Sequence, residues 1–352
     1  MTMTTDTRRP APFGRALCAM VTPFTDSGAL DLDGARRLAE HLVSRGCDGL
    51  VLSGTTGESP TTTDAEKAAL VAAVREAVGD RAALVAGVGT ADTRHTVELA
   101  LAAEKAGADG LLVVAPYYSR PPQDALEAHF REVADASGLP VMLYDIPART
   151  GTRIEPDTVV RLAGHPRIVA VKDCAYDVLG TQKVLSRTDL AYYAGCDEQV
   201  LALYAIGATG CVSTVANVVP GLFRSVLDSF DAGDTGRAAL LQRRAVPLIE
   251  SMMAAGLPGT VTAKALLGAL GLPAGPVRAP LRPAAPGTTA GLLAAYEELA
   301  APAGHPSMQV TATCHEQQPP RSPAVSRAAS ASTTTEGAAG GSICTSCAPT
   351  TS

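Results

Sequence analysis

The strongest constraint on the fold is a two-part unit, a short apolar run followed by an amphipathic stretch, which recurs about every 20–35 residues. Stretches with helical spacing, among them Asp33–Arg45 and Asp64–Val78, separate the runs, and we predict Asp33 and Asp64 as their N-caps. Eight strands that alternate with helices predict an α/β fold, a (β/α)8 TIM barrel. The eight apolar runs are Ala16–Val21, Gly49–Ser53, Ala83–Val88, Gly110–Ala115, Pro140–Tyr144, Ile168–Lys172, Leu190–Ala194 and Gly210–Ser213.

The competing fold is a doubly wound open sheet, which is disfavoured because no G-x-G-x-x-G follows the first run. After the eighth run the helical pattern continues to about residue 300, which predicts a C-terminal helical appendage of the kind often used in oligomer packing. The remaining chain has no aromatic residue and is rich in Ala, Ser, Thr, Pro and Gly, so it cannot bury enough apolar surface to fold. The predicted parts are a disordered N-terminus (1–12), the barrel (13–231), a C-terminal helical region (232–301) and a disordered tail (302–352).

Charge and cysteine content exclude several classes of function. A net charge of −6 without a basic cluster argues against a nucleic-acid partner, and no apolar run is long enough for membrane insertion. Because the first residues lack the apolar core of a signal peptide, we expect reduced thiols and a cytoplasmic protein. The pair Cys344 and Cys347 is only weak evidence for zinc or redox chemistry, and no metal site is predicted.

One lysine lies where the active site of such a barrel is expected, at the end of a strand. The chain has five lysines, and four lie in helix-like stretches, whereas Lys172 follows the apolar segment 168–171. Partial desolvation there would lower the pKa of its amine and free it to attack a carbonyl carbon. The alternative interpretation is a structural lysine paired with Asp173 or Glu58.

Two other strand ends carry hydroxyl groups. Tyr144 ends the fifth strand and could relay protons to a lysine adduct, or could bond only to backbone. Gly54-Thr-Thr-Gly follows the second strand, and its Thr55 and Thr56 could hold a carboxylate, although the same sequence could form an ordinary turn. It is no Walker A loop, because no Gly-Lys-Ser/Thr follows.

Two further groups complete the rim. Pro116-Tyr-Tyr118 follows the fourth strand, where the aromatic rings could line a pocket or a subunit interface. Arg149 comes five residues after Tyr144 and could clamp a carboxylate bidentately or lie in solvent. Together, these groups suit a reaction in which a keto acid held as a Schiff base adds to an anionic aldehyde.

In order and spacing these motifs resemble the dihydrodipicolinate synthase family, part of the pyruvate-dependent class I aldolases that include N-acetylneuraminate lyase. The resemblance runs from about Phe13 to Leu299 and is closest to actinobacterial members. It implies condensation of pyruvate with L-aspartate 4-semialdehyde to 4-hydroxy-tetrahydrodipicolinate, in diaminopimelate and lysine biosynthesis. No metal or organic cofactor is implied, and a homotetramer is expected. The motifs are Gly54-Thr-Thr-Gly-Glu58, Pro116-Tyr-Tyr118, Tyr144-Asp-Ile-Pro-Ala-Arg-Thr-Gly151 and Val171-Lys-Asp173.

The resemblance also implies a role for each site residue. Lys172 would bind pyruvate as an imine, and Tyr144, Thr55 and Tyr118 would form a proton relay in which Tyr118 reaches in from a neighbouring subunit. Thr55 and Thr56 would hold the pyruvate carboxylate. The remaining implied contacts are Arg149, for the carboxylate of the semialdehyde, and Gly195 and Val212, for the pyruvate pocket.

Two positions depart from the family pattern and leave a second hypothesis open. The chain has Cys196 where relatives often have Asp, and Tyr176 where close relatives have a small or basic residue. A related aldolase that uses a different aldehyde is therefore the alternative function, and a catalytically inactive binding protein is the third. The positions that match the feedback site of some members predict weak or no inhibition by L-lysine; these are Pro60, Asp64, Lys67, Ala91 and His95.

Overall fold

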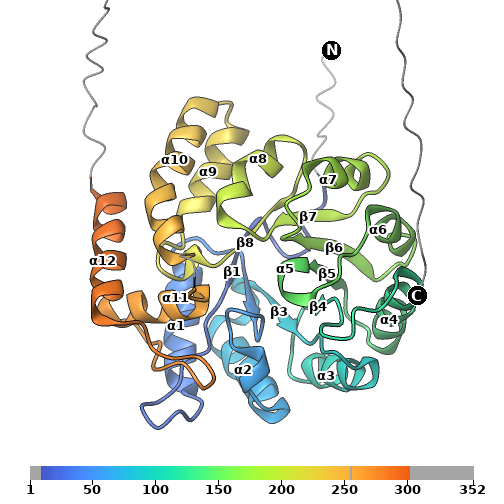
Figure 1. Cartoon of the computed structure of the whole chain (residues 1–352), viewed down its shortest axis with the longest axis horizontal. Coiled ribbons are helices and arrows are strands. Elements are labelled where there is room, and N and C mark those ends of the chain that lie inside the picture. The colour runs from blue at the N-terminus through green and yellow to red at the C-terminus, as the bar shows by residue number, and fades with distance from the viewer. Residues whose placement is uncertain (1–8, 254–255, 302–352) are drawn as a thin grey trace, which may run out of the picture. The chain divides into compact units, whose positions relative to one another are not determined.

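Eight parallel strands close into a barrel, in chain order, in a computed structural model that describes residues 9–253 and 256–301 (Figure 1). This confirms the predicted (β/α)8 fold, and every predicted strand lies within two residues of an observed one. The register continues around the ring and closes between β1 and β8, where Leu17 pairs with Val212. The strands are β1 (Ala16–Ala19), β2 (Gly49–Leu52), β3 (Ala83–Gly87), β4 (Gly110–Val114), β5 (Val141–Asp145), β6 (Ile168–Asp173), β7 (Ala191–Ala194) and β8 (Gly210–Ser213).

Helices follow the strands and cover the outside of the barrel. The predicted N-caps of the first two were wrong: Asp31 caps α1, and Thr63 caps α2 in a capping box with Glu66. Asp33 and Asp64 lie instead in the first turns, where a carboxylate still interacts favourably with the helix dipole. The helices up to the eighth strand are α1 (Leu32–Ser44), α2 (Asp64–Val78), α3 (Thr93–Lys105), α4 (Gln123–Ala136), α5 (Pro147–Thr150), α6 (Pro156–Leu162), α7 (Val178–Leu185) and α8 (Val200–Ala205).

The strands separate two apolar cores. Because successive strand residues point to opposite faces, Leu17 and Ala19 lie in the inner core with Tyr144 and Cys174, whereas Cys18 packs outward against the helices. On β6 the same alternation directs Ala170 inward, and with it Lys172 two residues later. The sequence of β6 thus places a polar side chain at the mouth of an otherwise apolar interior.

The helical pattern after the eighth strand forms four helices: α9 (Leu222–Asp231), α10 (Thr235–Met252), α11 (Gly259–Ala269) and α12 (Pro286–Ala300). Helix α10 packs against α9 and α12, and α12 packs against α11 (Figure 1). The three last helices confirm the predicted helical appendage. None of the helices in the described residues is both long and apolar enough to cross a lipid bilayer.

The predicted limits of the four parts stay predictions. Residues 1–8 and 302–352, including Cys344 and Cys347, lie outside the described residues. At the N-terminal end of the described chain, the Arg9 guanidinium donates hydrogen bonds to the carbonyls of Thr188 and Leu190.

Candidate active site

Lys172 lies at the carboxyl end of β6, beside Tyr144 at the end of β5. The two residues are register partners on adjacent strands, and the Lys172 Nζ lies 4.3 Å from the centroid of the Tyr144 ring. Both side chains are only 4% exposed. The end of the barrel therefore holds an amine and a phenol in contact, in a largely dehydrated setting.

The structural interpretation of Lys172 does not hold. Glu58 pairs with Lys264, at 2.6 Å. The Asp173 carboxylate instead accepts hydrogen bonds from the hydroxyls of Tyr192 and Thr181. Burial lowers the pKa of Lys172, and the positive charge of Arg149 adds to this effect, although nearby thiols and Asp197 oppose it. A buried lysine without a carboxylate partner favours the neutral amine, which is the nucleophilic form.

Two groups of the site influence the Tyr144 phenol. They are Thr55, from the loop after β2, and Cys174, two residues after Lys172. Burial raises the pKa of Tyr144 well above the usual value and the Cys174 thiol adds to the rise, whereas Thr55 lowers it, so the phenol is protonated and can donate. Thr55 and Tyr144 line the same cavity within one chain.

The loop that carries Thr55 and Thr56 is held at both ends. Ser53 and Glu58 have left-handed backbone angles, with φ of 53° and 57°, and such conformations persist in non-glycine residues only where surrounding contacts enforce them. The Thr260 hydroxyl donates to the Thr55 carbonyl at 3.3 Å. The Thr56 hydroxyl lies 3.2 Å from that of Thr214 after β8. Both predicted threonines therefore have fixed positions at the mouth of the barrel.

A buried ion pair fixes the same loop from the C-terminal appendage. Glu58 and Lys264 of α11 are 1% and 2% exposed, and Glu58 also accepts a hydrogen bond from the backbone N–H of Arg278 at 2.8 Å. Lys264 in turn donates to the Pro276 carbonyl and lies 4.0 Å from the centroid of the Phe24 ring. The partner of Glu58 is therefore Lys264, about 200 residues away in the chain, and not Lys172.

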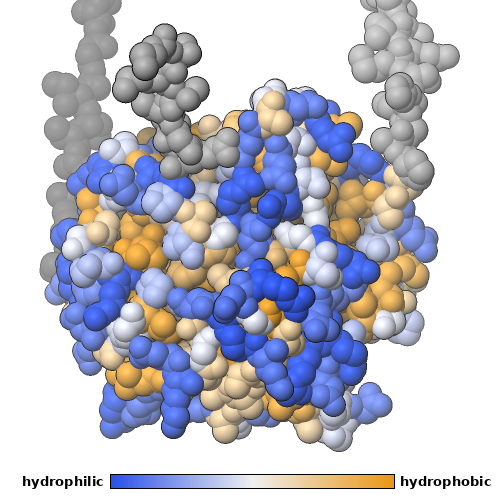
Figure 2. Space-filling model, turned by 180° about the vertical axis from the view of Figure 1, so that it is seen from behind, coloured by the Kyte–Doolittle hydropathy of each residue, from blue (hydrophilic) through white to orange (hydrophobic). Residues whose placement is uncertain are grey.

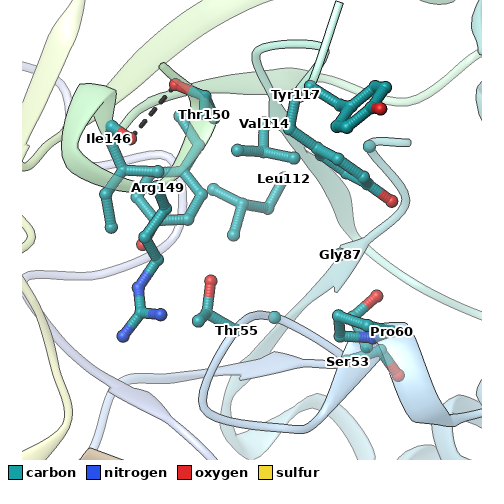
Figure 3. Close-up of a pocket in the computed structure, with 15 residues that line it drawn as sticks. Ser53, Thr55, Pro60, Gly87, Leu112, Val114, Tyr117, Ile146, Arg149 and Thr150 are labelled. Carbon is teal, nitrogen blue, oxygen red and sulfur yellow. Dashed lines mark hydrogen bonds between the residues drawn. The ribbon is translucent and has the colours of Figure 1, made fainter. Parts of the chain in front are cut away.

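A cavity of about 380 Å³ opens above Tyr144 and Thr55. Figure 3 shows Arg149 and Thr55 on one side of it and Tyr117 on the other. Arg149 is exposed on the short helix α5, which the bond from the Thr150 hydroxyl to the Ile146 carbonyl helps to hold (3.1 Å). Its guanidinium makes no ion pair within the described residues. The cavity thus offers an available cation to an anionic ligand.

Tyr118 lines the rim of this cavity, but its side chain is 95% exposed. Its backbone has φ of +73°, a strained conformation for a residue with a side chain. No hydrogen bond joins it to Tyr144 or Thr55 within the described chain. The structure therefore brings together four of the predicted groups, Lys172, Tyr144, Thr55 and Arg149, and directs Tyr118 outward.

Neither Gly195 nor Val212 lines the cavity, but Gly195 lies next to the lysine. A Cβ atom on Gly195 would come within 3.0 Å of the Lys172 Cε and 2.4 Å of the Cys174 sulfur, so only glycine leaves room for both side chains. Val212 of β8 is fully buried in the inner core with Tyr144. Their predicted contact with a ligand stays a prediction.

Cys174 is a neighbour of the site that the sequence analysis missed. It packs in the inner core with Tyr144 and raises the pKa of that phenol. The period of two in a strand was the available signal, since residue 174 faces the same side as residue 172. In the described residues, no group of three or more His, Cys, Asp or Glu side chains is arranged to hold a metal ion.

Comparison with known proteins agrees with this geometry. The chain matches the dihydrodipicolinate synthetase family over residues 12–296. It is 90% identical over 302 residues to 4-hydroxy-tetrahydrodipicolinate synthase 1 of Streptomyces coelicolor, covering 86% of this chain and 99% of that protein. It is 61% identical to the synthase of Acidothermus cellulolyticus, over 79% of this chain and 89% of the relative.

Solved structures give the same result. The enzyme of Cyanidioschyzon merolae, whose crystal structure has lysine bound, superposes with a TM-score of 0.80 at 35% identity and covers 83% of this chain and 99% of its own. A dihydrodipicolinate synthase of Bacillus anthracis gives 0.79 at 36% identity, with 81% and 98% covered. The sequence match, the barrel and the strand-end residues all agree, and the chain belongs to the dihydrodipicolinate synthetase family.

Proposed function

We propose that this chain is a 4-hydroxy-tetrahydrodipicolinate synthase, a lyase that condenses pyruvate, bound as an imine on Lys172, with L-aspartate 4-semialdehyde. The carrying observation is the buried Lys172 amine, which has no carboxylate partner among the described residues and lies 4.3 Å from the centroid of the Tyr144 ring; Tyr144 in turn lines the cavity. The family relatives that carry this activity in their names span nearly the whole described chain.

The first half of the reaction makes a nucleophile from pyruvate. The neutral Lys172 amine attacks C2 of pyruvate, and loss of water from the carbinolamine gives the imine. Tyr144, whose high pKa keeps the phenol protonated, can donate the proton that the departing hydroxyl needs. The hydroxyls and backbone N–H groups of Thr55 and Thr56 would hold the carboxylate. Loss of a proton from C3 then gives the enamine.

The second half joins the two substrates. C3 of the enamine attacks the aldehyde carbon, and the new alkoxide takes a proton. The amino group of the semialdehyde then displaces Lys172 from C2, which closes the ring and regenerates the free amine. Arg149 has a free guanidinium at the cavity and can bind the carboxylate of this second substrate through two parallel hydrogen bonds.

The assembly we propose is a homotetramer in which Tyr118 of one subunit completes the relay of its neighbour. Support comes from the side chain of Tyr118, which is almost fully exposed although its backbone is strained. Further large apolar side chains are exposed on the same chain, and Figure 2 shows apolar patches between polar ones on the face opposite to Figure 1. These exposed residues include Leu101, Tyr117, Val178 and Leu179.

Borohydride trapping tests the imine directly. We expect pyruvate and borohydride to add a reduced adduct to Lys172, which also blocks tryptic cleavage there, so the fragment 168–183 stays whole in peptide mass spectrometry. Lys172→Met is the negative control, and Lys183→Met, on the exposed face of α7, should still give the adduct. An unmodified Lys172 under conditions that consume pyruvate would contradict the proposal.

The alternative aldolase is tested by steady-state assays with several aldehydes. Cys196 and Tyr176, the two departures from the family pattern, do not line the cavity, and the Tyr176 hydroxyl is bonded to Glu198 on the surface. We therefore expect the semialdehyde to be the preferred substrate. Comparable turnover with a sugar-derived aldehyde, and none with the semialdehyde, would favour the alternative.

A further inference from the structure

Two cysteines follow adjacent strands directly beside the Lys172 side chain. Asp173 of β6 is the register partner of Ala194 of β7, and the Gly195 N–H donates to the Asp173 carbonyl at 2.8 Å. Cys174 and Cys196 are the next residues along, offset by one position. Strand spacing and rise place the Cα atoms of such a pair roughly 6 Å apart. Native disulfides usually span about this Cα separation.

The Cys174 sulfur lies directly over Gly195, because a Cβ there would meet it at 2.4 Å. Cys196 packs at the edge of the same inner core as Cys174. The two thiols interact, because Cys196 raises the pKa of Cys174 and Cys174 lowers that of Cys196. Both are free thiols. The missing side chain at Gly195 leaves the space that the Cys174 sulfur fills.

Their surroundings differ in the way that thiol oxidation requires. Cys174 is 6% exposed, whereas Cys196 is half-buried. The neighbouring Cys174 thiol lowers the pKa of Cys196, with help from Tyr176, although burial opposes this. Cys196 is thus the better nucleophile, and Cys174 is the buried thiol poised behind it.

We propose that Cys196 and Cys174 form a thiol-oxidation site that reacts with hydroperoxides and controls the neighbouring lysine. The Cys196 thiolate attacks one oxygen of the peroxide and forms a sulfenic acid as the O–O bond breaks. With hydrogen peroxide, the other oxygen leaves as hydroxide and takes a proton to become water. The Cys174 sulfur then attacks the resulting sulfenic acid and displaces a second water molecule. Two electrons pass from the sulfurs to the peroxide, and an external thiol reverses the change.

The disulfide would disturb the lysine and its phenol together. Forming it draws toward Cys196 the Cys174 sulfur, which now packs in the inner core with Tyr144 and raises the pKa of that phenol. It also crosses the backbone of Gly195, where the Lys172 Cε passes within contact distance. This effect on activity rests on the proposed function, whereas the cross-link itself does not.

Peptide mapping tests the cross-link without reference to activity. Reduced full-length protein is treated with hydrogen peroxide, alkylated and digested with trypsin, which puts Cys174 on fragment 173–183 and Cys196 on fragment 188–224. We expect these fragments joined, with the loss of two hydrogen atoms, and separated again by dithiothreitol. Fragmentation between Cys196 and the buried Cys211 assigns the bond. Cys196→Ser and Cys174→Ser should each abolish the joined pair. Sulfinic acid on Cys196 with Cys174 still reduced would overturn the proposal.

Imine trapping tests the consequence, with cyanoborohydride because it reduces imines and spares disulfides. Oxidised wild-type protein should form the pyruvate adduct at least about tenfold more slowly, because displacements near 1 Å can cost about a hundredfold. Dithiothreitol should restore the rate, and Cys196→Ser should resist peroxide. A cross-linked protein that traps pyruvate at the full rate would refute control of the lysine. If the reduced protein also forms no adduct, the proposed function fails while the mapped disulfide stands.

Discussion

At the scale of single residues, one substitution tests whether the Tyr144 phenol transfers protons. Tyr144→Phe keeps the ring beside the Lys172 amine and removes only the hydroxyl proposed to transfer the proton. Because a positioned general acid contributes about 10²–10⁴-fold, we expect kcat to fall by about a hundredfold or more. Tyr193→Phe is the matched control, since its hydroxyl bonds to the Gly14 carbonyl and not to the site. Equal losses in both variants would indicate a packing defect.

Arg149 can be tested by separating charge from geometry. Arg149→Lys retains the positive charge but not the two parallel N–H donors, and Arg149→Ala removes both. A lost hydrogen bond to a charged group costs about 1.5–3 kcal/mol, so we expect kcat/KM for the semialdehyde to fall roughly ten- to a hundredfold in each. Pyruvate trapping on Lys172 should remain near the wild-type rate. A parallel loss of trapping would place Arg149 at the pyruvate carboxylate instead.

At the scale of elements, the C-terminal helix α11 supports the loop after β2 through one ion pair. Lys264→Met leaves Glu58 buried without its partner, which typically costs about 3–5 kcal/mol, and should loosen Thr55 and Thr56. We expect a lower melting temperature together with a raised KM for pyruvate. The double variant Lys264→Met with Glu58→Gln removes the unpaired charge and should recover most of the stability. If the single variant melts like the wild type, the pair does not hold the loop.

The elements also show how far sequence reasoning reaches. Strand positions were predictable because short apolar runs between amphipathic stretches must be buried. The ends of these strands then located Lys172, Tyr144 and Thr55. The caps at Asp31 and Thr63 were missed because several polar residues precede each helix, and the backbone alone selects the one that reaches an N–H group. Long-range partners such as Lys264 for Glu58 are set by tertiary packing, which no local pattern encodes.

At the scale of the whole molecule, one buried carboxyl makes folding stability depend on pH. Burial raises the pKa of Asp145 to about 7, with the charge of Asp173 adding to the rise. The neutral Asp145 carboxyl therefore stabilises the folded protein fully below the unfolded pKa near 4. This contribution is lost as the pH rises through about 7. Asp145→Asn, which keeps the acceptor for the Ile154 N–H, should flatten this dependence by on the order of a few kcal/mol. Denaturant unfolding gives the free energy of unfolding of each protein at pH 5 and pH 8. An equal change in this free energy between the two pH values in the wild type and the variant would contradict the assignment.

Assembly determines whether Tyr118 acts within its own chain or on a neighbour, and complementation between two inactive variants distinguishes these cases. Lys172→Ala lacks the amine, and Tyr118→Phe lacks the exposed hydroxyl. If Tyr118 acts across a two-fold interface, a mixed pair has one site with Lys172 from one subunit and Tyr118 from the other. Equal co-expression should then restore about a quarter of the wild-type activity, since half of the random pairs are mixed and each has one complete site. If Tyr118 acts in its own chain, no mixed pair contains a complete site, and the activity stays at the average of the two variants.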